Sequence, residues 1–240
     1  MQEIESNSMD YRTWSIDTCI ICDIKNDEDW VPYRLLFNDE EIKSELLYEN
    51  EYFFIIADIA PLAEGHYLIN YNQHISSFSC VDKKILDELG KLKRALRQIL
   101  KDDYGELIFF EHGAGLDENG GCCINHAHLH VLPANFDILS RIREDFVFEE
   151  KDIYDLLLLP NTRGYLYYED TNGKVFISEN KDRVKIPSQY FRRIIAAENK
   201  EKTVWNWRDQ VKYADLLNTK GKILQAQRKL RSKYSVLLPH

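Results

Sequence analysis

The sequence lacks the segments that mark membrane and secreted proteins. Its apolar runs, such as residues 53–56 and 156–159, are short, whereas a helix that crosses a bilayer needs roughly 20 apolar residues. Residues 1–10 are polar and acidic and show no basic stretch followed by an apolar one, so they do not resemble a signal segment. We therefore expect a soluble, cytoplasmic protein that makes no membrane contact.

Cysteine is scarce, and its number is odd. Five cysteines in 240 residues argue against a framework of disulfides. The sequence also contains no internal repeat and no low-complexity segment. Apolar residues, in contrast, are plentiful: 44% of the chain is hydrophobic and 12% is aromatic. This is enough for the core of one large domain, or of one domain with an appended segment.

The charge is negative overall, at −9, but unevenly distributed. Residues 181–240 carry 15 Lys and Arg against 5 Asp and Glu, so the rest of the chain is strongly acidic. Basic, solvated helices could complement an acidic first domain, or they could bind the phosphates of a substrate or a nucleic acid. The first explanation is favoured for most of these charges, and we do not expect a nucleic-acid partner.

Hydrophobic spacing predicts an α+β fold with an antiparallel sheet. Strands are expected at 46–48, 52–56, 65–69 and 107–111. A long helix is expected at 81–101, where apolar residues recur at steps of three and four. Ser79 with Asp82 suggests its N-terminal cap.

A different pattern follows residue 135. The sequence Asp170-Thr171-Asn172-Gly173 predicts a turn between strands at 165–168 and 174–177, because Asn-Gly accepts positive φ. Helices are expected at 187–197, near 207–217 and at 223–234. We predict a catalytic domain at 1–137 and a C-terminal extension of hairpin and helices, packed on it, at 138–240.

Three histidines, His126, His128 and His130, alternate with the apolar residues Ala127 and Leu129. A strand here would place all three imidazoles on one face, roughly 7 Å apart at a rise of about 3.3 Å per residue. That spacing would let one phosphate contact them together. Chance placement on an ordinary strand is the alternative, but seven histidines in 240 residues rarely form such an alternation.

The stretch from His126 to Leu132 resembles the signature of the histidine-triad (HIT) family, His-apolar-His-apolar-His followed by two apolar residues. The resemblance implies that His128 attacks the α-phosphorus of a nucleotide-like substrate and forms a nucleotidyl-histidine intermediate. His130 would stabilise the charge on the phosphate oxygens. A neutral imidazole suits this role because its ordinary pKa is about 6.5. The expected function is that of a nucleotidyl hydrolase or transferase, acting on a nucleoside phosphate or a dinucleoside polyphosphate.

Other functions remain open. Phosphate, instead of water, could take the nucleotidyl group, as in a phosphorylase or adenylyltransferase. The chain could also be a nucleotide- or nucleic-acid-binding module without turnover, although a pure binder would not need the middle histidine. The three histidines could instead bind a catalytic metal, but no acidic residue lies beside them to complete such a site.

Cys19 and Cys22 have the spacing of a zinc knuckle, although such a pair can also be redox-active or simply buried. Residues 65–69 and the later His74 resemble the Gly-His-x-Leu strand of the HIT family and the histidine just beyond it. In zinc-containing members, and in the related galactose-1-phosphate uridylyltransferases, these positions bind the metal with the first triad histidine. The resemblance implies a structural Zn²⁺ held by Cys19, Cys22, His74 and His126. His66 is left out because its family counterpart is not a ligand.

The resemblance also implies substrate contacts. Asp58, in Asp58-Ile59-Ala60-Pro61, matches the acidic residue that accepts from the ribose hydroxyls, although it could be a solvated residue before a turn. Cys122 and Cys123 stand where many members have Gln and Ser or Thr. Their backbone amides could hold the phosphate, or the cysteines could simply pack.

Arg192 and Arg193 could bind polyphosphate as bidentate donors, or they could form the polar face of an amphipathic helix. Small HIT proteins pair through their sheets as two-fold dimers. We therefore expect a homodimer, unless the C-terminal extension covers that edge instead.

Overall fold

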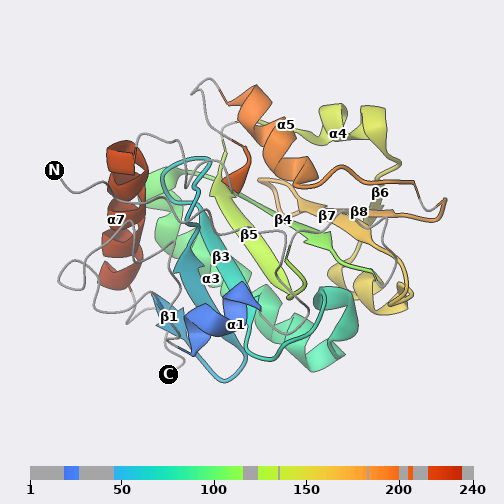
Figure 1. Ribbon diagram of the computed structural model, residues 1–240, viewed down its shortest axis with the longest axis horizontal. Coiled ribbons are helices and arrows are strands. Elements are labelled where there is room, and N and C mark those ends of the chain that lie inside the picture. The colour runs from blue at the N-terminus through green and yellow to red at the C-terminus, as the bar shows by residue number, and fades with distance from the viewer. Residues whose placement is uncertain are drawn as a thin grey trace, which may run out of the picture.

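The computed structural model (Figure 1) describes residues 19–26, 46–115, 124–134, 136–182, 184–199, 205–207 and 216–233. For residues 216–220 it describes the backbone alone. Within them lies one eight-stranded sheet in the order β1-β2-β3-β5-β4-β7-β8-β6. Every pairing is antiparallel. The α+β fold with an antiparallel sheet is thereby confirmed. Among the described helices, none combines the length and apolarity that crossing a membrane requires.

The strands are β1 (Tyr48–Glu49), β2 (Phe53–Ala57), β3 (Tyr67–Tyr71), β4 (Leu107–Gly113), β5 (His128–Pro133), β6 (Glu149–Lys151), β7 (Tyr165–Glu169) and β8 (Val175–Glu179). The helices are α1 (Ile20–Lys25), α3 (Lys83–Tyr104), α4 (Leu139–Asp145), α5 (Tyr190–Glu198) and α7 (Leu216–Ser232), with short 3₁₀ helices η2 (Phe78–Cys80) and η4 (Ile153–Leu158). The helix expected at 207–217 lies mostly outside the described residues.

The long helix α3 packs on one face of the sheet through an apolar stripe that includes Leu89 and Leu96. It begins two residues later than expected. Asp82 alone is its N-cap, because the Asp82 carboxylate accepts from the Ile85 amide at 3.0 Å. Ser79 belongs to η2 instead, so the cap predicted from the pair is only half correct.

Strand β5 lies between β3 and β4, near the middle of the sheet. Ala127, Leu129 and Val131 join the core on the α3 side, as the alternation predicts. The strand begins at His128, however, so His126 precedes it. In the register, His130 lies opposite Leu68 and His128 opposite Asn70. The triad therefore spans the entry into the strand.

The segment after residue 137 extends the same sheet. β7 pairs with β4 over five residue pairs, and β8 and β6 follow outward. The β7–β8 hairpin turns at Gly173, whose φ of 83° fits the predicted turn. A second apolar cluster, on the face opposite α3, joins Phe110 and Leu132 to Phe191 and Ile195 of α5. Figure 1 shows α5 beside α4 over this part of the sheet. The chain itself thus covers the outer edge of β4, and short strands form both ends of the sheet.

Candidate active site and candidate metal centre

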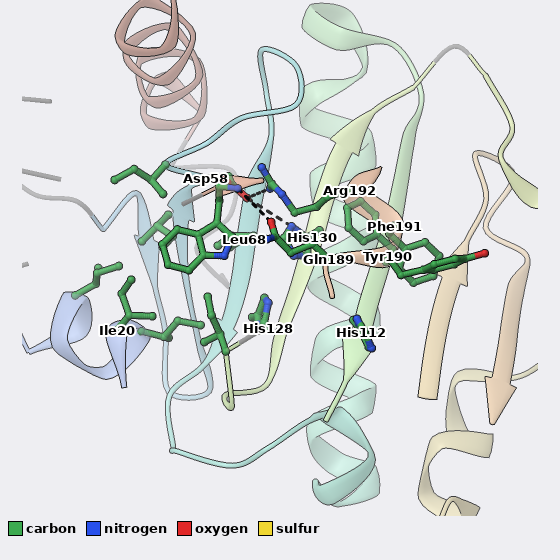
Figure 2. A pocket seen from close by; sticks show the side chains of 17 residues that line it. Ile20, Asp58, Leu68, His112, His128, His130, Gln189, Tyr190, Phe191 and Arg192 are labelled. Atoms are coloured by element: carbon green, nitrogen blue, oxygen red, sulfur yellow. Dashed lines mark hydrogen bonds and ion pairs between the residues drawn. The ribbon is translucent and has the colours of Figure 1, made fainter. Parts of the chain in front are cut away.

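A pocket opens over His128 and His130, on the face of the sheet opposite α3 (Figure 2). It encloses about 810 Å³, its open mouth included. Isoleucines of α1 line it together with Ile56, Ile59, Ile124, Phe110, Tyr190 and Phe191. The C-terminal segment adds Gln189, Arg192 and Trp207. The lining is therefore mostly apolar, and the two histidines are among its few polar groups.

His128 is buried at the start of β5, and its two ring nitrogens have different surroundings. Nδ1 lies 2.6 Å from the carbonyl oxygen of His126. Because a carbonyl can only accept, Nδ1 carries the proton and Nε2 holds the lone pair. Burial lowers the pKa of His128, although the His126 carbonyl opposes this shift. The imidazole is therefore neutral near pH 7, with a nucleophilic nitrogen available.

His130 has the opposite tautomer, which His66 determines. The Leu62 amide donates to Nδ1 of His66 at 3.1 Å, so His66 carries its proton on Nε2. That proton is donated to Nδ1 of His130 at 2.9 Å, which leaves the proton of His130 on Nε2. Burial lowers the pKa of His66 to about 4 and holds that of His130 well below its usual value. Both rings are neutral, and His130 is a hydrogen-bond donor at Nε2.

The rings of His128 and His130 are closer together than strand spacing alone suggests. Their centroids lie 5.2 Å apart, against the roughly 7 Å expected from backbone rise. His130 stacks on Phe110, with centroids 4.5 Å apart and planes inclined by only 6°. This stacking fixes the orientation of the His130 ring. The ring of His128, with its lone pair on Nε2, and the ring of His130, with its donor at Nε2, are therefore held close together.

Cys19, Cys22, His74 and His126 converge at the other end of the triad, and their ligand atoms all lie within 4.8 Å of one another. Nδ1 of His126 is 3.4 Å from Sγ of Cys19 and 3.5 Å from Sγ of Cys22. Nδ1 of His74 lies 3.5 Å from Sγ of Cys22. Zinc bonds of about 2.3 Å to sulfur and about 2.0–2.1 Å to nitrogen separate S from N by about 3.5 Å in a tetrahedron. The donor set therefore fits Zn²⁺.

Two further features of this cluster suit a cation. Nε2 of His126 lies 2.8 Å from the carbonyl oxygen of Tyr71, so Nε2 carries the proton and Nδ1 faces the cysteines as a lone pair. Burial and the neighbouring Cys19 raise the pKa of the Cys22 thiol to about 12. Two thiolates side by side would need a cation between them.

Asp58, His66 and His130 form a second group of potential ligands among the described residues, but its hydrogen bonds do not suit a metal. The Leu62 amide requires a lone pair on Nδ1 of His66, which places the proton on Nε2, the atom that faces the group. A protonated nitrogen cannot bind a cation. Within this group, the hydrogen bond from His66 to His130 orients His130.

Both oxygens of the Asp58 carboxylate are engaged within the protein. Oδ1 accepts from the Ala60 amide at 2.7 Å, and Oδ2 accepts from Nη1 of Arg192 at 2.9 Å. Burial alone would raise the pKa of Asp58, but the Arg192 guanidinium lowers it below the usual range. A ribose hydroxyl that bound Asp58, as the sequence predicts, would share these oxygens with the Ala60 amide and Arg192.

The two arginines have different positions. Arg192 is buried and holds Asp58 and two backbone carbonyls, so it is not on a solvated helix face. Arg193 is exposed, donates to the Ser188 carbonyl and lies 4.0 Å from the Trp205 ring centroid. Of the two, only Arg192 lines the pocket. Cys122 and Cys123 lie outside the described residues, so their predicted phosphate contact stays a prediction.

His66 and Gln189 are functional candidates that the sequence did not reveal. Gln189 has a φ of 57° just before α5, and its side chain binds the Asn206 side chain and the Trp207 amide. These contacts bring Trp207 into the pocket wall. For His66, the only available signal was a histidine just ahead of β3, whose register with β5 the sequence does not give.

Comparison with known proteins agrees with this arrangement. The family model described as "Scavenger mRNA decapping enzyme C-term binding" matches residues 18–144, just over half of the chain. An uncharacterised HIT-like protein of Borreliella burgdorferi is 30% identical over 120 residues, which cover 48% of this chain and 74% of that protein. The chain belongs to the histidine-triad family. The adenosine 5′-monophosphoramidase HINT3 of Mus musculus is 27% identical over 135 residues, 54% of this chain and 73% of that protein.

Solved HIT structures match about half of the chain. A Zn-bound histidine triad family protein from Mycobacterium smegmatis has 21% identity and a TM-score of 0.37, and the match covers 51% of this chain and 79% of that one. A hypothetical histidine triad nucleotide-binding protein from Sulfolobus tokodaii has 25% identity and a TM-score of 0.36, with 50% and 71% covered.

Proposed function

We propose that this HIT protein is a nucleotide hydrolase or nucleotidyltransferase, which acts on a nucleoside phosphate or a dinucleoside polyphosphate through a covalent nucleotidyl-His128 intermediate. The observation that carries the proposal is the bond from Nδ1 of His128 to the His126 carbonyl. It directs an unprotonated Nε2 toward a pocket with largely apolar walls. The similarity to an adenosine 5′-monophosphoramidase supports a nucleotide as the substrate.

In the first step, the Nε2 lone pair of His128 attacks the α-phosphorus, and the bond from phosphorus to the leaving group breaks. The leaving group departs with that electron pair and, where it is an amine, takes a proton from solvent. The imidazole becomes a cation. The His126 carbonyl stabilises this cation because it keeps accepting the hydrogen bond from Nδ1. Nε2 of His130 donates to a non-bridging oxygen, where negative charge develops. His66 keeps that proton on the correct nitrogen of His130.

In the second step, water or another acceptor attacks the phosphorus and the phosphorus–nitrogen bond breaks, which returns the electron pair to Nε2 of His128. The acceptor loses its proton to solvent, and neutral His128 is regenerated. Two displacements replace a single difficult one. Whether the acceptor is water or phosphate separates a hydrolase from a phosphorylase.

The proposal includes a structural Zn²⁺ on Cys19, Cys22, His74 and His126. When bound, the ion would cross-link α1 to the entry of β5 and would take no part in the reaction. Since His126 would be one of its ligands, the ion would also fix the carbonyl that orients His128. In this proposal His126 binds the metal and His128 is the nucleophile.

A product analysis tests the proposed function. Purified protein is incubated with adenosine 5′-phosphoramidate and with a diadenosine polyphosphate, in ¹⁸O-labelled water, with and without inorganic phosphate. We expect release of a nucleoside monophosphate that carries ¹⁸O, or of a nucleoside diphosphate when phosphate is the acceptor. The absence of turnover for both substrates under both conditions would contradict the proposal.

A further inference from the structure

The apolar lining of the pocket comes from two separate buried clusters. Phe110, Tyr190 and Phe191 belong to one of them. The other supplies a set of residues that we call the α1 group: Ile20, Ile21, Ile24, Ile56, Ile59, Leu68 and Trp207. Figure 2 shows Ile20 and Tyr190 on opposite sides of His128. The lining therefore has two distinct apolar parts, and Trp207 belongs to the part that includes α1.

The α1 group adjoins Asp58. Ile56 and Ile59 flank this residue closely in the sequence, and the Trp205 carbonyl accepts from Arg192, which also donates to Asp58. Ligand pockets bury the apolar parts of a ligand against hydrophobic side chains. With the phosphate of a nucleotide at His128 and its ribose at Asp58, the base would therefore enter the α1 group.

This base position is already filled. Each residue of the α1 group is at most 9% exposed, and Trp207 itself is 8% exposed. An aromatic side chain buries roughly 150–250 Å² when it packs, and a nucleobase is of similar size. The α1 group offers no comparable free surface, so a base cannot contact it unless one of its members moves.

Trp207 is the member best placed to move. Its indole is a fused pair of aromatic rings and so has the shape of a purine base. Residues 205–207 lie outside the sheet and beyond residues 18–144, which match the family. Three hydrogen bonds attach them to the start of α5: Arg192 Nε to the Trp205 carbonyl at 2.9 Å, Gln189 Nε2 to Asn206 Oδ1 at 2.8 Å, and the Trp207 amide to Gln189 Oε1 at 3.1 Å.

Gln189 makes its part of this attachment in a strained conformation. Its φ of 57° lies in the left-handed region, and no other non-glycine residue in the described part of the chain has a positive φ. A residue with a Cβ adopts this region at a cost in free energy. Release of Asn206 and Trp207 would remove contacts that hold Gln189 there, so the strain favours opening.

We infer that Trp207 occupies the base position of the nucleotide site in this same chain, and that a nucleotide binds by displacing it. The inference rests on the proposed function for the class of ligand. The affinity for a nucleotide is then reduced by the free energy of moving residues 205–207 out of the pocket. Trp207 thereby determines how much the base contributes to binding.

The test compares two ligands by calorimetry: adenosine 5′-monophosphate, and ribose 5-phosphate, which lacks the base. Trp207→Ala empties the base position, so adenosine 5′-monophosphate should bind at least about tenfold more tightly than to the wild type, and ribose 5-phosphate should change less than about threefold. Weaker binding of adenosine 5′-monophosphate would show that Trp207 supports the base instead of replacing it. Weaker or unchanged binding would overturn the inference.

Two further variants sharpen the test. Trp205→Ala is the matched control, because Trp205 is not among the lining residues and its bond to Arg192 is made by the backbone. Both affinities should stay within about threefold of the wild type, and a gain equal to that of Trp207→Ala would overturn the inference. Gln189→Gly accepts the positive φ but removes two of the three bonds, so adenosine 5′-monophosphate should bind about three- to tenfold more tightly. If Trp207→Ala does not fold, Gln189→Gly decides.

Fluorescence reports the displacement itself. The emission of Trp207, taken as the difference between the wild type and Trp207→Phe, should shift to longer wavelength when adenosine 5′-monophosphate saturates the site, because the indole enters water. Quenching without a shift would mean that the base stacks on an indole that stays in place, and would overturn the inference.

These measurements need no turnover, so they separate the inference from the proposed function. Tighter binding by Trp207→Ala in a protein that turns over no nucleotide would uphold the inference and contradict the proposed function. Turnover with unchanged affinities would do the reverse. If adenosine 5′-monophosphate binds to neither the wild type nor Trp207→Ala, the inference is overturned.

Discussion

The two ends of the histidine triad do different work, although their residues belong to one alternating pattern. His126 joins His74 and two cysteines in a cluster that suits Zn²⁺, whereas His128 and His130 face a pocket. His126 and His128 differ in which ring nitrogen donates a hydrogen bond to a backbone carbonyl. His126 donates through Nε2 to the Tyr71 carbonyl, and His128 donates through Nδ1 to the His126 carbonyl.

The comparison teaches that a backbone carbonyl or a neighbouring histidine is enough to assign the chemistry of an imidazole. A proton fixed on one nitrogen leaves a lone pair on the other. His126 thereby presents Nδ1 to the cysteines, and His128 presents Nε2 to the pocket. His130 receives a proton from His66 and becomes a donor.

The largest effect is expected at His128. His128→Ala removes the proposed nucleophile, so kcat should fall by about 10³-fold or more, while the Kd for adenosine 5′-monophosphate should change only a few-fold. Steady-state kinetics and calorimetry measure the two quantities. The matched control is His112→Ala, a pocket histidine to which the proposed mechanism assigns no step, for which less than about a tenfold loss is expected. Ordinary turnover by His128→Ala would rule out the mechanism.

A smaller loss is expected at His66, which acts through His130. His66→Phe keeps a buried ring but removes the donor to Nδ1 of His130, so kcat should fall by about 10- to 100-fold. His66→Gln retains an N–H donor and should recover part of this loss. The ¹⁵N chemical shifts of His130 should report a change of tautomer in His66→Phe alone. Unchanged shifts with a lowered kcat would mean that His66 only packs.

At the metal cluster, stability should change more than chemistry. The double variant Cys19→Ser, Cys22→Ser should lower the zinc content from about one ion per chain to none, and should lower Tm by several degrees. Its kcat should fall far less than that of His128→Ala. Elemental analysis and calorimetric melting provide the readouts. Protein purified without chelator that contained no zinc would refute the metal assignment.

The smallest effect concerns pH. Burial lowers the pKa of His66 from 6.5 to about 4 in the folded protein, so the native state favours the neutral ring. Above pH 6.5 the ring is neutral in both the folded and the unfolded state. As pH falls from 6.5 toward 4, the unfolded state binds the proton and the folded state does not, so the free energy of unfolding falls. Between pH 7 and pH 4, the wild type should therefore lose up to about 3 kcal/mol more unfolding free energy than His66→Phe. Denaturant unfolding at several pH values measures the difference, and parallel curves would contradict it.

Oligomeric state is a further point on which sequence and structure can be compared. The sequence favours a homodimer formed through the sheet, but β7 covers the β4 edge, and the end strands of the described sheet have two and three residues. Short edge strands discourage pairing between chains. Light scattering should thus give the mass of a single 28.4 kDa chain, whereas twice that mass would show a dimer built on another surface.

Local patterns were sufficient for the fold and for part of the site. The spacing of apolar residues located α3 and most of the strands, but not β6, and Asn172-Gly173 located the β7–β8 turn, because these signals lie within a few neighbouring residues. The approach of Cys19 and Cys22 to His74 and His126 was expected only through the family resemblance.

The rest depends on contacts between distant segments. Arg192 meets Asp58 across 134 residues, and His66 meets His130 across 64. No periodicity encodes either contact, since both follow from strand register and from the way α5 packs on the sheet. For the same reason, the sequence could not show that Asp58 is already paired.

The covalent step on His128 is the central claim, and the stereochemistry at phosphorus tests it most directly. A chiral α-phosphorothioate substrate is hydrolysed in ¹⁸O-labelled water, and the configuration of the product is determined by ³¹P NMR. Attack by His128 followed by attack by water inverts the configuration twice, so the account predicts net retention. This result does not depend on how long the intermediate survives. Net inversion would show that water attacks the substrate directly, and would contradict a nucleotidyl-His128 intermediate.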